Sequence, residues 1–541
     1  MSISTFDPDG VLAPLRLWQA WPEVRFVKTP APCLRHHDLL KSMQALTVRY
    51  PGDIHLEEIG RSFLERPIHL VKLGVGDKNV LFWSQMHGDE PSATPALLDM
   101  AGYLLANSDQ PACRAILESY TLLMIPMLNP DGAEVYERVN AQGIDINRDA
   151  LRLATPEGRL LKRIRDEYEP MLGLNLHDQG RMTTVGDTGR LATTSVLAVS
   201  GDVHNTLTRG RLRSKRACAA IVEALTGFIP GGVARYDESW SPLAFGDNMT
   251  AWGTPVVLIE CGGLPAGYEV TDLTRLSFVA LLTVLKGLAE DDLASYDPQV
   301  YEDLPENQTD AWSDVVVRGG LVLQPGAKEA FRSDLAFNYL HNGRQAAGCC
   351  TQKRVPSEVF LIGDASCHGA GTSVNANGKI LLAAFEVGLK GWSESAWLDQ
   401  GNLTRLARMG VGTIYWLVSE ADYFAARSHA DTLAIQGLPR IEVLTNFSIL
   451  PGLLLSGPPT RTGSTSMSAI LDSLGVDVKA GRVALETLWM APLGERHPSA
   501  RLCKNGPASF LMVSAGDDGQ FDLHTGQLLS VWLDGHEVEL N

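Results

Sequence analysis

A largely apolar run that stops at a histidine constrains the fold of this chain more than any other stretch. Residues 80–86 predict a buried strand. The run stops at His87-Gly88, and Pro91 suits the first position of a following helix. His87 and Glu90 are thus three residues apart at a strand-to-helix turn, where both side chains can point to one spot. Zinc accepts an imidazole nitrogen and a carboxylate oxygen as ligands, and one more histidine from another strand would complete such a site.

Two later predicted strands also lead into residues that can bind a metal or move a proton. A short apolar run leads into His177, and a β-branched run ends at Glu260. Ligand sites of open α/β sheets lie at the carboxyl ends of the strands, so we expect His87, His177 and Glu260 to meet there. His204 competes as the third ligand, but it lies in a polar segment, whereas His177 directly ends a predicted strand.

Strands alternate with helices through residue 290, which predicts an α/β fold with a mostly parallel or mixed central sheet and helices on both faces. The length of 541 residues exceeds what one hydrophobic core usually holds. Changes in composition set the expected boundaries. They are an N-terminal extension (1–60), the α/β catalytic domain (61–292), a polar and acidic linker (293–313) and a Gly-rich, β-rich accessory domain (314–541).

The charge and the N-terminus restrict the expected partners and location. A formal net charge of −17 argues against nucleic acid or an anionic membrane as the main partner. The N-terminus shows no cationic segment followed by an apolar core, and no apolar run reaches membrane-spanning length. We therefore expect a cytoplasmic protein, while the sequence makes no prediction of its oligomeric state.

Six motifs between residues 87 and 260 stand in the order of a known family. Through them, about residues 60–290 resemble the zinc carboxypeptidases, and in particular the compact bacterial branch that includes murein-peptide amidases. The motifs are His87-Gly88-Asp89-Glu90, Asn129-Pro130-Asp131-Gly132, Arg138, Asn147-Arg148, His177 and Glu260.

The resemblance implies a metallopeptidase with one zinc ion per chain. His87, Glu90 and His177 would bind the zinc, and Glu260 would activate the metal-bound water as general base and later act as the acid. The chemistry of these residue types agrees, because zinc lowers the pKa of a bound water to ≈ 7. A carboxylate that takes and returns the proton typically contributes ~10²–10⁴-fold.

The resemblance also implies where the substrate binds. Arg138 would polarise the scissile carbonyl, Asn147 and Arg148 would hold a free carboxylate, and Tyr236 would cap the substrate. A guanidinium beside an amide suits bidentate capture of a carboxylate. The expected reaction is therefore hydrolysis of a peptide or amide bond next to a free carboxylate.

Two acids depart from the family pattern and bear on the substrate. Asp149 follows Asn147-Arg148, and Asp178 follows His177. Negative charge at these positions is expected near the pocket, where it would favour an amine-bearing substrate such as a diaminopimelate peptide. The pocket floor is expected within residues 240–252.

Other functions remain open at this point. A zinc deacylase of N-acyl amino acids, like aspartoacylase and succinylglutamate desuccinylase, would share the metal ligands and the carboxylate capture. Residues 314–325 and 528–540 resemble the opening and closing β segments of amidohydrolases. The His-x-His metal pair of that family is missing, since Cys367-His368-Gly369 offers one histidine. A non-catalytic role, or an amidohydrolase-like role of the second domain, is the remaining alternative.

Overall fold

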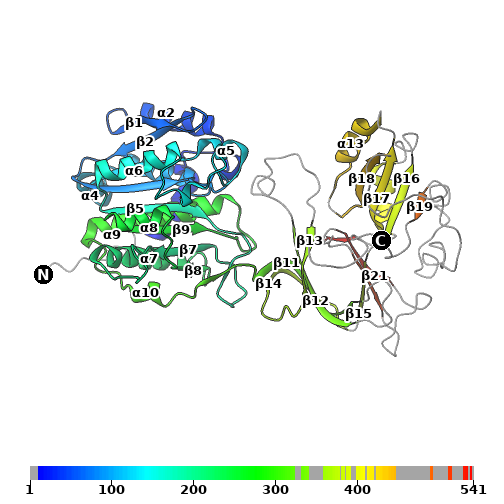
Figure 1. The fold of residues 1–541 in the computed structure, drawn as a ribbon. Coiled ribbons are helices and arrows are strands. Elements are labelled where there is room, and N and C mark those ends of the chain that lie inside the picture. Colours follow the sequence, from blue (N-terminus) through cyan, green and yellow to red (C-terminus); the bar gives the residue numbers. More distant parts are fainter. Residues whose placement is uncertain are drawn as a thin grey trace. The chain divides into compact units, whose positions relative to one another are not determined.

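The computed structural model describes residues 10–322 without a gap. In the remainder it describes 331–339, 357–377, 379–383, 385–390, 398–408, 411–418, 422–435, 437–445, 488–490, 510–514, 528–533 and 536–538. The chain divides into two units, Met1–Trp312 and Ser313–Asn541 (Figure 1). No helix among the described residues is long and apolar enough to cross a bilayer.

A mixed sheet forms the centre of the first unit. In spatial order its strands are β1 (Ile54–Arg61), β2 (Pro67–Leu73), β4 (Tyr120–Ile125), β3 (Lys78–Ser84), β5 (Leu172–Asp178), β9 (Val256–Cys261), β7 (Thr194–Ala198) and β8 (Val233–Arg235). The four central strands β4, β3, β5 and β9 run parallel, whereas β2 pairs antiparallel with β4 and β7 with β9. The predicted α/β fold class is therefore confirmed.

Helices cover both faces of this sheet (Figure 1). One face packs against α1 (Pro14–Val24), α2 (His36–Arg49), α3 (Thr94–Ala106), α4 (Pro111–Ser119), α7 (Arg209–Thr226) and α9 (Thr271–Asp291). The other packs against α6 (Pro156–Tyr168) and α8 (Phe245–Ala251). Alternate residues of β3 enter the two cores, Val80 and Phe82 one core and Leu81 and Trp83 the other. A strand buried on both faces reads as a continuous apolar run, which is what the sequence shows here.

Short elements complete the first unit. They are the 3₁₀ turns η1 (Ala31–Cys33) and η2 (Ile146–Arg148), the helices α5 (Pro130–Val135) and α10 (Gln299–Glu302), and the two-stranded sheet of β6 (Thr184–Val185) and β10 (Asn307–Gln308). The segment expected as an N-terminal extension contributes α1, α2 and most of β1 to this unit. The expected linker 293–313 contributes α10 and β10.

The turn after β3 differs from the prediction in one respect. Pro91 does not occupy the first helical position, because α3 begins at Thr94. Residues 87–93 instead form turns, in which the N–H of Glu90 donates to His87 O and the N–H of Thr94 to Pro91 O (3.3 and 3.0 Å). These turns separate the metal-ligand motif from the helix.

The second unit is rich in sheet, as expected. One sheet has the order β13 (Ser357–Gly363), β12 (Phe331–Tyr339), β11 (Trp312–Val322), β15 (Lys379–Ala383), β20 (Phe510–Ser514), β21 (Leu528–Leu533) and β22 (His536–Val538), with β14 (Gly369–Asn375) paired to β11. The other has the order β18 (Arg440–Thr445), β17 (Val411–Val418), β16 (Phe385–Lys390) and β19 (Leu488–Met490), with helices α12 (Gln400–Arg408) and α13 (Tyr423–Thr432) between its parallel strands. The two segments resembling amidohydrolases fall partly outside the described residues, and their described parts share the first of these sheets.

Candidate active site

Three neighbouring parallel strands carry the residues predicted to bind metal and transfer protons. His87 follows the end of β3 by three residues, His177 lies in β5 and Glu260 lies in β9. His177 and Glu260 face each other in the register of β5 and β9. The carboxyl edge of these strands opens into a pocket of about 580 Å³, which His87, His177 and Glu260 all line.

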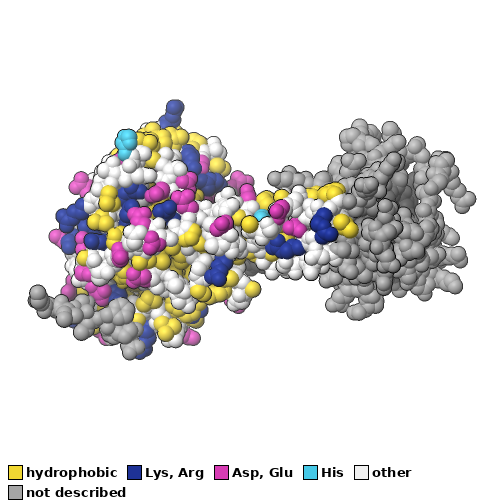
Figure 2. Space-filling view, turned by 90° about the horizontal axis from the view of Figure 1, so that it is seen from below, with side chains coloured by type: hydrophobic (Ala, Val, Ile, Leu, Met, Phe, Trp, Pro, Cys, Tyr) yellow, Lys and Arg dark blue, Asp and Glu magenta, His cyan; other side chains and the backbone are white. Residues whose placement is uncertain are grey.

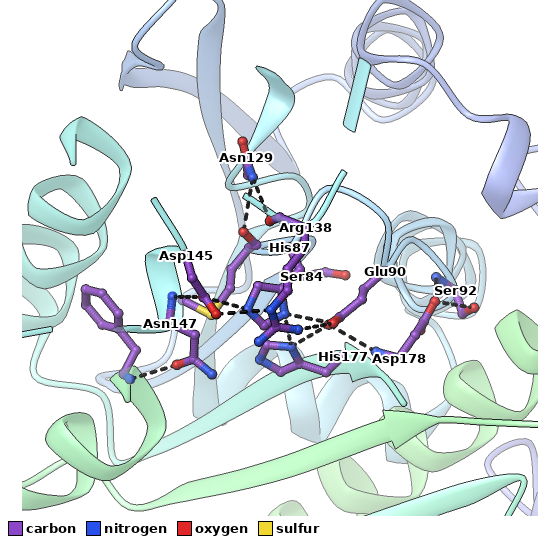
Figure 3. A network of polar contacts seen from close by, with 12 residues as sticks. Ser84, His87, Glu90, Ser92, Asn129, Arg138, Asp145, Asn147, His177 and Asp178 are labelled. Atoms are coloured by element: carbon purple, nitrogen blue, oxygen red, sulfur yellow. Dashed lines mark hydrogen bonds and ion pairs between the residues drawn. The ribbon is translucent and has the colours of Figure 1, made fainter. Parts of the chain in front are cut away.

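His87, Glu90 and His177 converge at one point of this pocket (Figure 3). The Nδ1 atom of His87 lies 2.8 Å from one oxygen of Glu90, and the Nδ1 atom of His177 lies 2.6 Å from the other. The two Nδ1 atoms are 3.1 Å apart. All three side chains are buried. His204 is exposed and does not belong to this cluster.

The donor set and its spacing fit a zinc ion. Zinc–ligand bonds of about 2.0–2.1 Å at a tetrahedral angle place ligand atoms roughly 3.3 Å apart. The two imidazole Nδ1 atoms, 3.1 Å apart, lie close to that value, and each lies within 2.8 Å of one of the two Glu90 oxygens, somewhat closer than zinc would hold them. Two imidazoles and one carboxylate also make up a ligand set that leaves a fourth position for water or substrate.

Asp145 holds His87 from the side opposite to the metal position. Its Oδ1 atom lies 3.0 Å from Nε2 of His87, and its Oδ2 accepts a hydrogen bond from Nε of Arg138 (3.0 Å). The backbone N–H of Asn147 also donates to Oδ1 (2.8 Å), so Asp145 caps η2. With the proton on Nε2, the lone pair of His87 Nδ1 is free for the metal, an arrangement common behind zinc-binding histidines.

Electrostatics favour the charged form of Asp145. Burial acts to raise its pKa, but the hydrogen bond with His87 and the charges of His87 and Arg138 outweigh it. The pKa of this carboxyl is therefore held well below its usual range.

Glu260 lies in the pocket in a strongly desolvated position. Burial raises the pKa of its carboxyl well above the usual value, and the charges of Glu90 and Asp178 add to the effect. Tyr236 lines the same pocket. The pKa of its phenol is raised, mainly by the negative charge of the nearby Glu260 and to a lesser extent by burial. The structure thus brings both predicted residues to the metal-ligand cluster.

Arg138 reaches the cluster from the loop after α5. Besides its contact with Asp145, its Nη1 atom donates to Oε1 of Glu90 (3.0 Å). Its Nη2 atom makes no hydrogen bond with any described residue, and the side chain lines the pocket and is 44% exposed. A guanidinium fixed through two nitrogens with the third free can present a preorganised donor to a substrate oxygen.

Comparison with known proteins agrees with this geometry. Residues 39–159 match the zinc carboxypeptidase family. This part of the chain belongs to that family. The matched segment carries His87, Glu90, Arg138, Asn147 and Arg148. Its placement in the compact bacterial branch stays a prediction.

Several curated relatives align with short parts of this zinc carboxypeptidase unit. Carboxypeptidase 2 of Trichophyton rubrum is 34% identical over 98 residues, which cover 18% of this chain and 18% of that protein. Carboxypeptidase SOL1 of Arabidopsis thaliana is 30% identical over 123 residues, which cover 21% of this chain and 25% of that protein. Carboxypeptidase D of Homo sapiens is 28% identical over 137 residues, covering 21% and 10%. The chain thus spans a quarter or less of these relatives.

Solved structures give more extended matches at low identity. A metallo-carboxypeptidase of Pseudomonas aeruginosa in complex with (2-guanidinoethylmercapto)succinic acid is 20% identical, with a TM-score of 0.38 over 47% of this chain and 69% of that one. Carboxypeptidase A of Helicoverpa armigera is 16% identical, with a TM-score of 0.39 over 53% and 81%.

The two residues predicted to hold a carboxylate lie on η2 and line the pocket. Oδ1 of Asn147 accepts a hydrogen bond from the N–H of Phe245 (2.8 Å), which ties η2 to the start of α8. Arg148 is exposed, and its guanidinium makes no ion pair with any described residue. Its Nη1 atom donates to Asn147 O (2.9 Å), and a guanidinium without a carboxylate partner at the pocket wall is suited to an anionic group of a substrate.

The two acids that depart from the family pattern have different positions. Asp149 is buried away from the pocket and holds the residues just before α6, accepting hydrogen bonds from the N–H of Ala154 and from the N–H and hydroxyl of Thr155, which caps α6 (2.7–2.8 Å). The expectation that it adds charge to the pocket was wrong, because its carboxylate is used by the helix start. Asp178 does line the pocket and accepts from the hydroxyl of Ser92 (2.8 Å). Burial, with the charge of Glu90, raises its pKa to about 8.

The sequence interpretation missed Asp145, Gln179 and Asn307 as residues of this site. The sequence signal for Asp145 is its position two residues before Asn147, where it caps a turn. This signal is weak, because many capping residues have no other role. The segment expected to hold the pocket floor, 240–252, does contribute to the lining, with Trp240, Gly246 and Asp247 among its members.

Proposed function

We propose that the first unit is a zinc-dependent metallocarboxypeptidase. It binds one zinc ion through His87, Glu90 and His177 and hydrolyses a peptide or amide bond next to a free carboxylate. The observation that carries this proposal is that these three residues share one pocket with Glu260 and with the guanidinium of Arg148, which has no carboxylate partner among the described residues. The substrate is a peptide with a free C-terminus, and the cytoplasmic location is proposed from the sequence alone.

Each pocket residue has a chemical task in this reaction. Bound zinc supplies a Lewis acid and lowers the pKa of water. Glu260 takes a proton from the attacking water on its carboxylate and returns it to the leaving nitrogen. Arg138 donates from Nη2 to the carbonyl oxygen, where negative charge develops. Arg148, beside Asn147, binds the terminal carboxylate.

The comparisons favour this function over the N-acyl amino acid deacylase. The relatives that align with the unit are named carboxypeptidases, and the family match covers the segment that supplies Arg138, Asn147 and Arg148. The second unit is not assigned a catalytic function.

The zinc content and the activity of two variants test the proposal. Wild-type protein should contain one zinc per chain and release C-terminal residues from a panel of acylated peptides. Glu260→Gln should keep the zinc and lose turnover by roughly 10²–10⁴-fold or more. Glu269→Gln, at an exposed position, serves as the control and should keep both. Turnover that persists in Glu260→Gln would exclude the proposed proton transfer.

A further inference from the structure

After its last long helix the chain of the first unit returns to the active-site pocket. Residues 303–309, which lie between α10 and β11, form the connector, so named because the second unit follows them. It contains β10, which pairs antiparallel with β6 so that Asn307 lies opposite Val185. The N–H of Gly186 also donates to Glu306 O (2.8 Å). One edge of the connector is therefore fixed to the segment between β5 and β7.

The other edge of the connector is fixed to the end of β8. The N–H of Arg235 donates to Pro305 O (2.8 Å), and its guanidinium pairs with Oε1 of Glu306 (3.0 Å). Tyr236, the predicted substrate-capping residue, follows directly in the sequence. The connector thus lies between two walls of the pocket and is hydrogen-bonded to both.

A side-chain bridge links the connector to the residues after the metal ligand His177. The Nδ2 atom of Asn307 donates to Oε1 of Gln179 (3.1 Å), which also accepts from the hydroxyl of Ser195 (3.0 Å). The Nε2 atom of Gln179 donates to Ala192 O (2.8 Å). Because both ends of the Gln179 amide are occupied, its orientation is fixed, and so is that of Asn307.

The connector presents only some of its side chains to the pocket. Asn307 and Thr309 line the pocket, whereas Gln308 between them is exposed and does not. This alternation follows from the two-residue period of extended chain. Asn307 uses one amide hydrogen for Gln179 and retains a second, so it can pair with the backbone of an extended peptide.

We propose that the connector is a wall of the substrate-binding site and that Asn307 is a specificity-determining residue. Asn307 hydrogen-bonds the backbone of a peptide substrate N-terminal to the residue that precedes the scissile bond, since Asn147 and Arg148 take the terminal carboxylate. The proposal rests on the proposed function, and it predicts tighter binding of peptides that are longer than a dipeptide.

Kinetics of Asn307→Ala in the full chain test this proposal. The substrates are an N-acylated dipeptide and an N-acylated tetrapeptide with the same C-terminal residue. The variant should raise KM for the tetrapeptide roughly 2- to 10-fold, the effect of one hydrogen bond, and leave KM for the dipeptide unchanged. Gln308→Ala is the matched control and should change neither. Zinc content should stay at the wild-type level in both variants.

A binding measurement separates this proposal from the proposed function. Calorimetric titration of the tetrapeptide into Glu260→Gln protein, with and without Asn307→Ala, measures the same contact without turnover and should give the same fold-change. Equal effects on both peptides, or none on the tetrapeptide, would overturn the role of Asn307. A wild-type protein that binds zinc but cleaves neither peptide would instead overturn the proposed function.

Discussion

Asp145 links the metal position to the substrate position at the scale of single residues. Its carboxylate contacts Nε2 of His87 and Nε of Arg138, and it has no place in the metal-ligand set itself. It therefore fixes both the tautomer of His87 and the direction of the Arg138 guanidinium, which is the proposed donor to the substrate. Removing its charge should disturb both functions without removing a ligand.

Asp145→Asn should weaken zinc binding by about 10- to 100-fold, as loss of a carboxylate behind a ligating histidine typically does. The zinc Kd, measured by competition with a chromophoric chelator, checks this. Asp187→Asn, at an exposed position, is the control and should leave the Kd unchanged. An unchanged Kd in Asp145→Asn would show that His87 needs no carboxylate to hold its tautomer.

Arg148→Ala should raise KM about 10- to 100-fold and change kcat little, because a charge-assisted hydrogen bond of roughly 1.5–3 kcal/mol is lost from substrate and transition state alike. Steady-state kinetics with a peptide that has a free C-terminus measure this. The neighbouring exposed Arg152→Ala is the matched control. A C-terminally amidated peptide should bind poorly to both the wild type and Arg148→Ala. If the wild type bound the amidated peptide more tightly than the free acid, the role of Arg148 would be contradicted.

At the scale of elements, helix α3 anchors the N-terminal segment through one buried carboxylate. Asp99 accepts hydrogen bonds from Nε1 of Trp21 in α1 (2.9 Å) and from the N–H groups of Phe26 and Val27 (2.5 and 3.1 Å). Burial outweighs these bonds and raises the pKa of Asp99 to about 6. The anchor is therefore an acid that the folded protein prefers to keep protonated.

This shift predicts a pH dependence of stability. Since the folded pKa lies above the unfolded value of about 3.9, the contribution of Asp99 is largest below pH 4 and is lost as the pH rises toward about 6. The free energy of unfolding of wild type relative to Asp99→Asn should fall by on the order of 2–3 kcal/mol over that range. Chemical denaturation at several pH values measures it. Asp53→Asn, at an exposed position, should show no such trend.

The sequence carries clear start signals for long helices and no signal for the shortest strands. Helix α6 begins at Pro156 with Thr155 as its cap and ends at Tyr168, as the cap and the proline predict. Thr208 likewise caps α7. Strands β6, β8 and β10 have two or three residues each, too few for a periodic signal, and exist because distant backbone pairs with them.

At the scale of the whole molecule, surface charge and metal binding are properties of the first unit as a whole. Acidic and basic side chains are interspersed over the face of this unit seen in Figure 2. The net charge of −17 therefore does not by itself mark a binding surface there. The predicted ligands come from the turns after β3 and from β5, so metal binding should stabilise the unit in which these segments lie.

Zinc should raise the free energy of unfolding of the first unit by about 2.7 kcal/mol at a free concentration of 100 Kd. Calorimetry of the full chain with buffered zinc and with a chelator measures the shift of its transition. His87→Ala should unfold at the same temperature in both conditions. A zinc-dependent shift that survives in His87→Ala would place the metal elsewhere in the chain.

The sequence by itself determined the three buried strands, the residues at their ends and the family, because these depend on local periodicity and on motif order. Tertiary structure decided which residues near the motifs share the site. Asp149 and Asp178 each follow a motif residue, yet one holds the cap residue of α6 and the other lines the pocket, since side-chain direction depends on the local turn and its packing. Asn307 reaches Gln179 across 128 positions of sequence, a contact that no local pattern encodes.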